Sequence, residues 1–382
     1  MHTRDTKAMT ESGMTLVELL VTMVISLVMA AGIYAAFQST QFADMNTQET
    51  ASLLSGSRTA VTIMDSSLEN AGFLTSGVMG ASMCPTLLAY NGNASTSVTP
   101  ALYPVSAMPQ STSEDIPGTN VAYTTSGPPG MGTQAITTVS AGAFSGRGPL
   151  GNGLFSVVKT SPGTLNNASL FLNSTYQAAV GDLDIVMLPA SGVCIRMQVT
   201  NVGGANNIVH NSGTSALNPP NGFNGVSATA SPAIAPITLT DFQDAYVEDL
   251  GPPGKNSGFM QTTYSIGVTG NGGTALFQTV VNGSGQTISN GPIIANAVDL
   301  QALFGVMQNG HVVYQPWSQT IASQIVSVQY AILLRSASPL KNYVSPATIP
   351  VLTGITYNVP ADQMDYRYQV IQRTVVLRNS LL

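Results

Sequence analysis

The sequence predicts an α+β protein in which one long N-terminal helix, membrane-spanning in its first half, packs on a large β-rich head. The head is expected to be mostly antiparallel, with long loops. Three observations carry this prediction. The 19 residues from Leu19 to Phe37 are uncharged and mostly apolar, and small or apolar residues then recur at helical spacing as far as Leu68. Beyond Gly72, short strand-like runs alternate with Gly, Asn and Pro.

The apolar run is long enough for a helix that crosses a bilayer, yet Glu18 stands at its start. A carboxylate costs roughly 2.5 to 3.5 kcal/mol at the bilayer centre and less toward the interface, so Glu18 is a functional candidate. The alternative is an ordinary anchor whose Glu18 lies among the lipid headgroups.

The residues around Glu18 resemble the prepilin signal of type IV pilins and type II secretion pseudopilins. The signal consists of the Gly13–Met14 junction, with Glu18 as the fifth residue after Gly13. The resemblance implies that a prepilin peptidase cuts after Gly13 and that Met14 is N-methylated, so residues 1–13 are a cytoplasmic leader. The family more often has Phe where this chain has Met14. The apolar run follows the cut and therefore remains in the mature chain as its anchor.

The distribution of charge predicts the orientation of this anchor. Arg4 and Lys7 precede the apolar run, and the next basic residue is Arg58, whereas Asp44 and Glu49 follow the run. Because basic residues stay on the cytoplasmic side, the N-terminus is expected in the cytoplasm and the head in the periplasm or outside the cell.

The helix is expected to continue beyond the membrane. Residues 14–37 form the transmembrane half and residues 38–72 an amphipathic half, which ends near Gly72. The apolar stripe of this second half consists of Leu53, Ser57, Ala60, Val61, Met64 and Leu68. The alternative is two helices broken near Gly32 or Gly56, since a glycine costs about 1 kcal/mol in a helix interior.

The β-rich head is expected over residues 73–382, with loop-rich segments at 91–163 and 203–236. The first of these segments is interpreted as long loops with brief strands. Clearer strands are expected at Leu183–Leu188, Cys194–Val202, Phe259–Val268, Thr274–Val281, Ile293–Phe304, His311–Tyr314, Val326–Arg335 and Tyr366–Leu377.

The head carries a narrower resemblance, to the PilW-like minor pilins of type IV pili. It depends on VDLQALFGV at 298–306, VSVQYAILLRS at 326–336 and YRYQVIQRTVVLRN at 366–379. SRTAVTIMDSSLENAGF at 57–73 is similar to the junction between stem and head in that family. The resemblance does not reach the two loop-rich segments, and it implies a pilin-like fold.

By this resemblance the chain is a structural subunit that helps to prime or initiate pilus assembly and sits at or near the pilus tip. Its partners would be the prepilin peptidase/N-methyltransferase, other minor pilins, the major pilin and the inner-membrane assembly platform. It would be a single-pass inner-membrane protein first and part of the cell-surface pilus afterwards. Glu18 would neutralise the amine of Met14 in an adjacent subunit, a pair that is stronger at low dielectric than in water.

Two other functions remain open. A minor pseudopilin of the type II secretion system would share the stem and the processing. A tip adhesin or DNA-uptake subunit would use segment 91–163 as its binding surface.

Composition argues against several further classes of function. The chain has 382 residues, a net charge of −6 and only 8% charged residues, so nucleic-acid binding by this chain alone through a broad basic surface is disfavoured. No G-x-S-x-G elbow, phosphate loop or dinucleotide fingerprint is present, and His210 and His311 have no Ser or Cys partner pattern. We therefore expect no enzyme activity and no cofactor.

Two cysteines, Cys84 and Cys194, follow the anchor and would lie in an oxidising compartment. A disulfide between them would close a loop of about a hundred residues, which the chain-entropy model values at roughly 4 to 5 kcal/mol. The alternative is two buried free thiols. A metal site is not expected, because His2, His210 and His311 supply no ligand spacing.

One acidic segment allows a second interpretation. Its carboxylates are Asp241, Asp244, Glu248 and Asp249. We expect a solvated acidic face, and calcium binding is the alternative, although the spacing is not that of an EF-hand. Asp182 and Asp184 are interpreted as polar residues at a strand start rather than as ligands.

Overall fold

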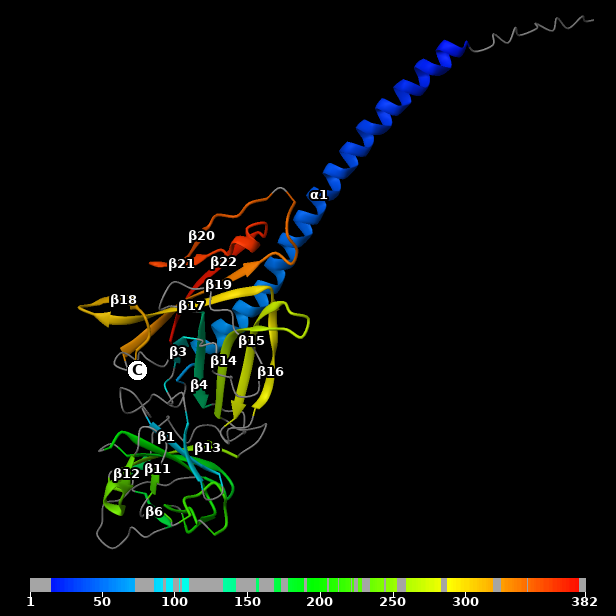
Figure 1. The fold of residues 1–382 in the computed structure, drawn as a ribbon. Helices are drawn as coiled ribbons and strands as arrows, with labels where there is room; N and C mark the ends of the chain where they lie inside the picture. The colour runs from blue at the N-terminus through cyan, green and yellow to red at the C-terminus, as the bar shows by residue number, and fades with distance from the viewer. Residues whose placement is uncertain are drawn as a thin grey trace, which may run out of the picture. The chain divides into compact units, whose positions relative to one another are not determined.

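The computed structural model of the chain describes residues 15–72, 86–91, 94–98, 103, 105–109, 133–141, 156–157, 168–172, 178–188, 191–204, 206–211, 213–220, 222, 226–228, 234–243, 245–252, 259–282, 287–318, 324–341 and 343–377. The chain divides into two compact units, Met1–Leu54 and Ser55–Leu382. An N-terminal apolar helix is followed by a large β-rich region with antiparallel sheets (Figure 1). The predicted α+β class is confirmed.

Helix α1 (Leu16–Glu69) is continuous, so it is not broken at Gly32 or Gly56. In the first unit its apolar side chains are exposed as far as Phe37. The helix is followed by a turn at Asn70 and Ala71, and Gly72 takes a φ of 74°, a left-handed conformation that suits glycine after a helix end. Gly72 is therefore the helix stop that its position in the sequence predicts.

The last turns of α1 belong to the second unit and bury one face there. The buried residues are Ser57, Ala60, Val61, Met64 and Leu68, which confirms the predicted stripe for the described side chains. Arg58, off the stripe, is exposed, and Asp65 and Glu69 are half-buried. Burial of this stripe supplies the stability that helix propensity alone would not provide.

Two antiparallel sheets contain the longest strands (Figure 1). The first consists of β3 (Val105–Pro109), β4 (Gln134–Ala141), β14 (Phe259–Val268), β15 (Thr274–Asn282) and β16 (Thr287–Ala295), in the order β16-β15-β14-β4-β3. The second consists of β17 (Ala297–Gln308), β18 (His311–Gln315), β19 (Ile325–Arg335) and β22 (Tyr368–Val376), in the order β18-β17-β19-β22.

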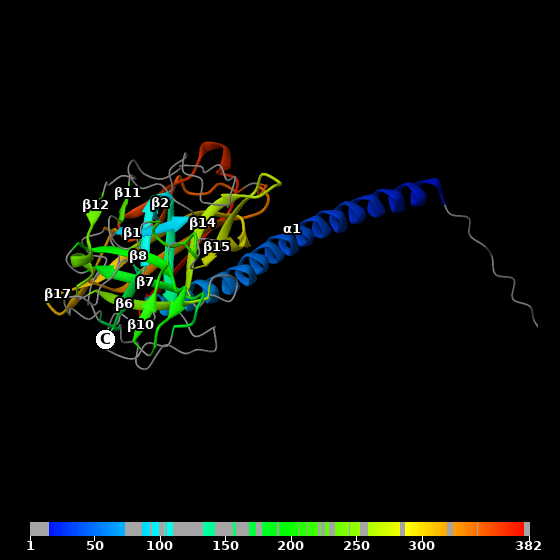
Figure 2. The ribbon, with the colours of Figure 1, turned by 90° about the horizontal axis from the view of Figure 1, so that it is seen from below.

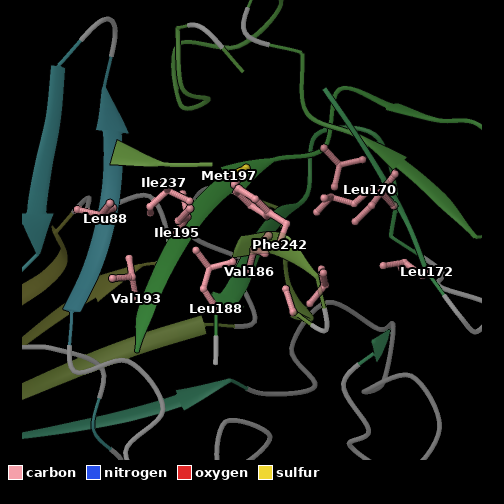
Figure 3. Close-up of a cluster of buried hydrophobic side chains, with 14 of the residues drawn as sticks. Leu88, Leu170, Leu172, Val186, Leu188, Val193, Ile195, Met197, Ile237 and Phe242 are labelled. Atoms are coloured by element: carbon pink, nitrogen blue, oxygen red, sulfur yellow. The ribbon is translucent and has the colours of Figure 1, made fainter. Parts of the chain in front are cut away.

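A third sheet contains β1 (Thr86–Asn91), β2 (Ala94–Val98), β5 (Ser156–Val157), β7 (Leu183–Leu188), β8 (Val193–Gln198) and β13 (Tyr246–Gly251). Its order is β2-β1-β8-β7-β13-β5, and the pair β1–β8 is parallel. Figure 2 shows β1, β8 and β7 side by side. The core on this sheet includes Leu88, Ile195 and Phe242 (Figure 3).

Short elements complete the described head. They are the strands β6 (Ser169–Phe171), β9 (Asn201–Val202), β10 (Asn207–Val209), β11 (Val226–Ala228), β12 (Ile234–Ile237), β20 (Thr348–Leu352) and β21 (Ile355–Asn358), and the 3₁₀ helices η2 (Leu239–Phe242) and η4 (Ala361–Gln363). The β20–β21 hairpin shares a core with the second sheet through Val351, Ala331 and Leu333.

Most of the predicted strands are confirmed, but two are wrong. The strand predicted at Cys194–Val202 is divided into β8, which ends at Gln198, and β9, which starts at Asn201. The strand predicted at Ile293–Phe304 is also divided. The chain instead ends β16 at Ala295 and starts β17 at Ala297. Asn296 between them has a φ of 60°, which turns the chain from the first sheet into the second. Its N–H donates to the carbonyl of Thr274, and its carbonyl accepts from the N–H of Arg335, so it is bonded to both sheets.

Candidate functional site at the N-terminal helix

The first unit presents an apolar helical surface at Leu16–Gln38, long enough to cross a membrane by length and composition. None of this segment is buried by the rest of the chain. A soluble protein would not leave so large an apolar surface in water, so this surface requires lipid or other apolar helices.

Glu18 lies in the first turn of this segment and closes a capping box with Thr15. The Thr15 N–H donates to Glu18 Oε2 over 3.1 Å, and the Thr15 hydroxyl donates to the same oxygen over 3.2 Å. In return, the Glu18 N–H donates to the Thr15 hydroxyl over 3.4 Å. This reciprocal arrangement satisfies two of the donors that a helix N-terminus leaves unpaired.

The capping box leaves Glu18 able to bind another donor. A carboxylate has about four acceptor positions, of which the two bonds from Thr15 occupy two. The side chain is exposed in the first turn of α1, at the positive end of the helix dipole. An ammonium group from another chain can therefore reach Glu18 without opening the cap.

The two predicted processing residues, Gly13 and Met14, lie outside the described residues, as does Cys84. Cys194 lies on β8 with a buried side chain. In the parallel pair β1–β8, Cys194 is opposite Leu87, three residues after Cys84 in the sequence. The structure thus leaves the pairing of Cys84 with Cys194 as a prediction.

Hydrogen bonds join the last turns of α1 to the sheets of the second unit. The Tyr330 hydroxyl on β19 donates to Asp65 Oδ1 over 2.7 Å, and the Ser67 and Thr138 hydroxyls lie 2.7 Å apart. The N–H of Gly72 donates to the carbonyl of Val139 over 2.7 Å. Burial, followed by the bond to Asp65, raises the pKa of the Tyr330 phenol above its ordinary value, so this donor stays protonated at neutral pH.

The acidic segment takes structural roles where the structure describes it. Asp241 Oδ2 accepts from the N–H of Thr238 over 2.7 Å, and this bond lowers the pKa of Asp241. Asp249 Oδ1 accepts from the N–H of Gly251 over 2.7 Å. Across the described parts of the chain, no group of three or more His, Cys, Asp or Glu is placed to hold a metal ion.

A buried pair that the sequence analysis missed joins Asp184 on β7 to His210. Nε2 of His210 lies 2.9 Å from Asp184 Oδ2, and both side chains are fully buried. Burial lowers the pKa of His210 to about 3, so the ring is neutral and the pair acts as an internal hydrogen bond. The neighbouring Asp182 accepts from the N–H of Ala179 over 2.7 Å, a bond that caps a turn.

Two family models match the chain, one in each unit. The prokaryotic N-terminal methylation motif matches residues 9–34, which span the Gly13–Met14 junction and Glu18. The type IV pilus-assembly protein W matches residues 263–379, from β14 through β22. The two matches support a PilW-like type IV pilin. No curated protein and no solved structure matches it significantly.

The matches indicate what the exposed apolar surface of the helix is for. The methylation motif implies processing by a prepilin peptidase, and with the apolar segment Leu16–Gln38 it makes the pilin membrane-anchored. Both families are structural components of pili rather than enzymes. The PilW match also contains Tyr330, whose bond to Asp65 fixes the end of the stem to the head.

The sequence contains a local signal for the capping box. A Thr followed three residues later by Glu, directly before an apolar run, is the pattern of a helix N-terminus. The bonds of Asp65 and His210 had no such signal, because their partners lie far away in the sequence.

Proposed function

We propose that this pilin is a minor subunit that primes pilus assembly and occupies the pilus tip or a position near it. The match to a pilus-assembly family over 263–379, together with the methylation motif over 9–34, carries this proposal. A large second unit, Ser55–Leu382, supports a terminal position, since a fibre end has room for a bulky head.

Processing would divide the chain as follows. Residues 1–13 are the leader, residues 14–37 the transmembrane half of the helix, residues 38–72 its periplasmic half, and residues 73–382 the head. The peptidase cuts after Gly13 and leaves a methylated amine. The head faces the periplasm until the subunit enters the fibre, and then the cell exterior.

Assembly would then depend on Glu18. The amine of Met14 of one subunit needs a counter-ion at the membrane, and Glu18 of a neighbour supplies it while it keeps its two bonds from Thr15. The apolar surface of Leu16–Gln38 is covered in the same step by the helices of the other subunits. The partners are other minor pilins, the major pilin and the inner-membrane assembly platform.

A secretion pseudopilin shares this chemistry, but the family description of PilW favours a pilus. The adhesin or DNA-uptake alternative rests on segment 91–163. Strands β3 and β4 come from this segment, and β4 pairs with β14, so deletion of the whole segment would remove part of a sheet. A deletion of residues 112–130 leaves five residues to connect Pro109 to Gln134, so it spares both strands and tests attachment.

The proposal predicts the phenotype of a strain that lacks this chain. Such a strain should make few pili, and the wild-type gene should restore them. The Glu18→Ala variant should be processed but poorly incorporated, whereas Asp44→Ala, which removes another exposed carboxylate of α1, should behave as wild type. Normal pilus numbers without the chain, or equal behaviour of the two variants, would refute the role.

We also propose a disulfide between Cys84 and Cys194. Thr86 begins β1 opposite Val193, and Cys84 is only two residues before Thr86, within about 7 Å of chain. Under non-reducing conditions a tryptic digest should contain the two cysteine peptides joined. Alkylation of both thiols in the unreduced, unfolded protein would contradict the bond.

A further inference from the structure

The β17–β18 hairpin leaves β18 as the outermost strand of the second sheet (Figure 1). Its turn consists of Asn309 and Gly310, with φ values of 51° and 80°. Positive φ at both positions is the mark of a type I′ turn, in which the flanking pair Gln308–His311 is hydrogen-bonded. The turn therefore determines which residues of β18 form hydrogen-bonded pairs with β17 and which form non-hydrogen-bonded pairs.

This alternation of pair types determines which backbone groups of β18 face outward. Hydrogen-bonded and non-hydrogen-bonded pairs alternate along an antiparallel ladder, so Val313 bonds to Val306 of β17. The N–H and C=O groups of Val312 and Tyr314 then point away from β17. Within the described part of the chain, no backbone hydrogen bond reaches these four groups. They form a ready site for another strand.

The side chains of the hairpin are exposed and uncharged. Met307 is 51% exposed, Val312 and Val313 are each 41% exposed and Tyr314 is 36% exposed. No Asp, Glu, Lys or Arg occurs between Leu300 and Leu334. An apolar edge strand without charge can pair with another uncharged strand.

The other edges of the two long sheets are protected. Edge strand β16 contains Pro292 and two bulges, and edge strand β3 contains Pro109. Edge strand β22, at the opposite side of the sheet from β18, exposes Gln372, Arg373 and Thr374. Proline, bulges and charge are the usual means of preventing edge pairing, and β18 has none of them.

We propose that β18 pairs with β18 of a second copy of this pilin, antiparallel and centred on Val313. The strand reads polar, apolar, apolar, apolar, polar, so it is self-complementary when reversed. His311 lies opposite Gln315 of the other copy, Val312 opposite Tyr314, and Val313 opposite Val313. This register hydrogen-bonds Val312 to Tyr314, the two residues whose backbone groups face outward. The two second sheets become one continuous sheet.

The contact is self-complementary and also free of electrostatic cost. No charge faces a like charge in this register, and His311 meets an amide. One strand pair buries less than the roughly 1,200 Å² of a stable interface, so the free heads would associate weakly. Anchoring of both copies in one membrane by Leu16–Gln38 raises their effective concentration and compensates for the small area. This inference does not depend on the role in priming.

Cysteine cross-linking of the full chain in its membrane tests the proposal. In the proposed register Val313 forms a non-hydrogen-bonded pair with its counterpart, with Cα atoms about 4.5 Å apart, a separation that a disulfide spans. Val313→Cys should therefore give a disulfide-linked dimer under mild oxidation. The matched control is Val376→Cys on β22, because Val376 is 52% exposed in the same sheet.

Two further measurements identify the contact. Val312→Pro removes an outward N–H but no bond to β17, and in the Val313→Cys background it should lower the dimer yield, with dimer affinity falling about thirtyfold. Mass spectrometry of the cross-linked species should find only this chain. Equal yields from the two cysteine variants, an undiminished yield with Val312→Pro, or a product linked to a different protein would each overturn the proposal.

Discussion

The bond between Tyr330 and Asp65 allows a quantitative test of how the stem is held in the head. Tyr330 is fully buried, and its hydroxyl lies 2.7 Å from Asp65 Oδ1. A hydrogen bond to a charged group contributes about 1.5 to 3 kcal/mol, and Phe keeps the ring and leaves no cavity. Asp65 is half-buried, so water replaces part of the lost bond. We expect Tyr330→Phe to lower the free energy of unfolding by about 2 kcal/mol.

Urea unfolding of the full chain in detergent measures this loss. Trp317 is the only tryptophan, and its Nε1 donates to the carbonyl of Val105 over 3.2 Å, so its fluorescence reports on the head. Tyr264→Phe is the comparison variant, because the bonds of the Tyr264 hydroxyl are longer and involve neutral groups. It donates to the carbonyl of Ile63 over 3.4 Å and accepts from Gln278 Nε2 over 3.2 Å, and its loss should cost about 1 kcal/mol.

A double-mutant cycle with Asp65→Ala isolates the pair. The loss from Tyr330→Phe should largely disappear in the Asp65→Ala background, which corresponds to a coupling energy of about 1.5 kcal/mol or more. Additive effects, or a loss no larger than that of Tyr264→Phe, would contradict a contribution of this charged pair to holding the end of α1.

Three further predictions concern single residues. Burial raises the pKa of Asp299 to about 6, above its unfolded value, so its stabilising contribution is present below about pH 4 and is lost as the pH rises through 6. The free energy of unfolding, measured by urea at pH 4 and pH 7, should therefore fall by an amount of order 3 kcal/mol that Asp299→Asn removes. Gly305→Ala should lower the free energy of unfolding, measured by urea, by about 1 to 3 kcal/mol, since the added Cβ would lie 2.6 Å from the side chain of Val312. An unchanged free energy of unfolding would mean that the hairpin moves to accommodate the Cβ without cost. Thr15→Ala should remove the capping box with Glu18 and destabilise the first turn of α1 by about 1 kcal/mol. Amide hydrogen exchange in that turn should become roughly fivefold faster, and unchanged exchange would contradict the capping role.

The sequence predicted the helix and many strands because their signals are local. The stripe from Ser57 to Leu68 repeats at helical spacing, and Gly72 supplies the left-handed stop. Strand β14 was predicted at its observed bounds, since turn residues flank a continuous strand-like run. The methylation signal was readable for the same reason, because all of its residues fall within Gly13 to Phe37.

What the sequence did not predict depends on contacts distant along the chain. Segment 91–163 was interpreted as long loops with brief strands, but the position of its strand β4 in the first sheet, between β3 and β14, was not predicted. Its partner strand β14 begins more than a hundred residues later, and no local sequence pattern predicts a pairing over that distance. The bond of Tyr330 to Asp65 and the pair of His210 with Asp184 are of the same kind.

Cleavage after Gly13 and assembly through Glu18 are the two steps that the proposed function requires of this chain. The intact mass of the chain recovered from sheared pili tests both steps in one measurement. We expect a mass that corresponds to residues 14–382 with one added methyl group in wild-type pili, and almost no chain in pili from the Glu18→Ala strain. A full-length mass, or equal recovery of the Glu18→Ala chain, would contradict the proposed function.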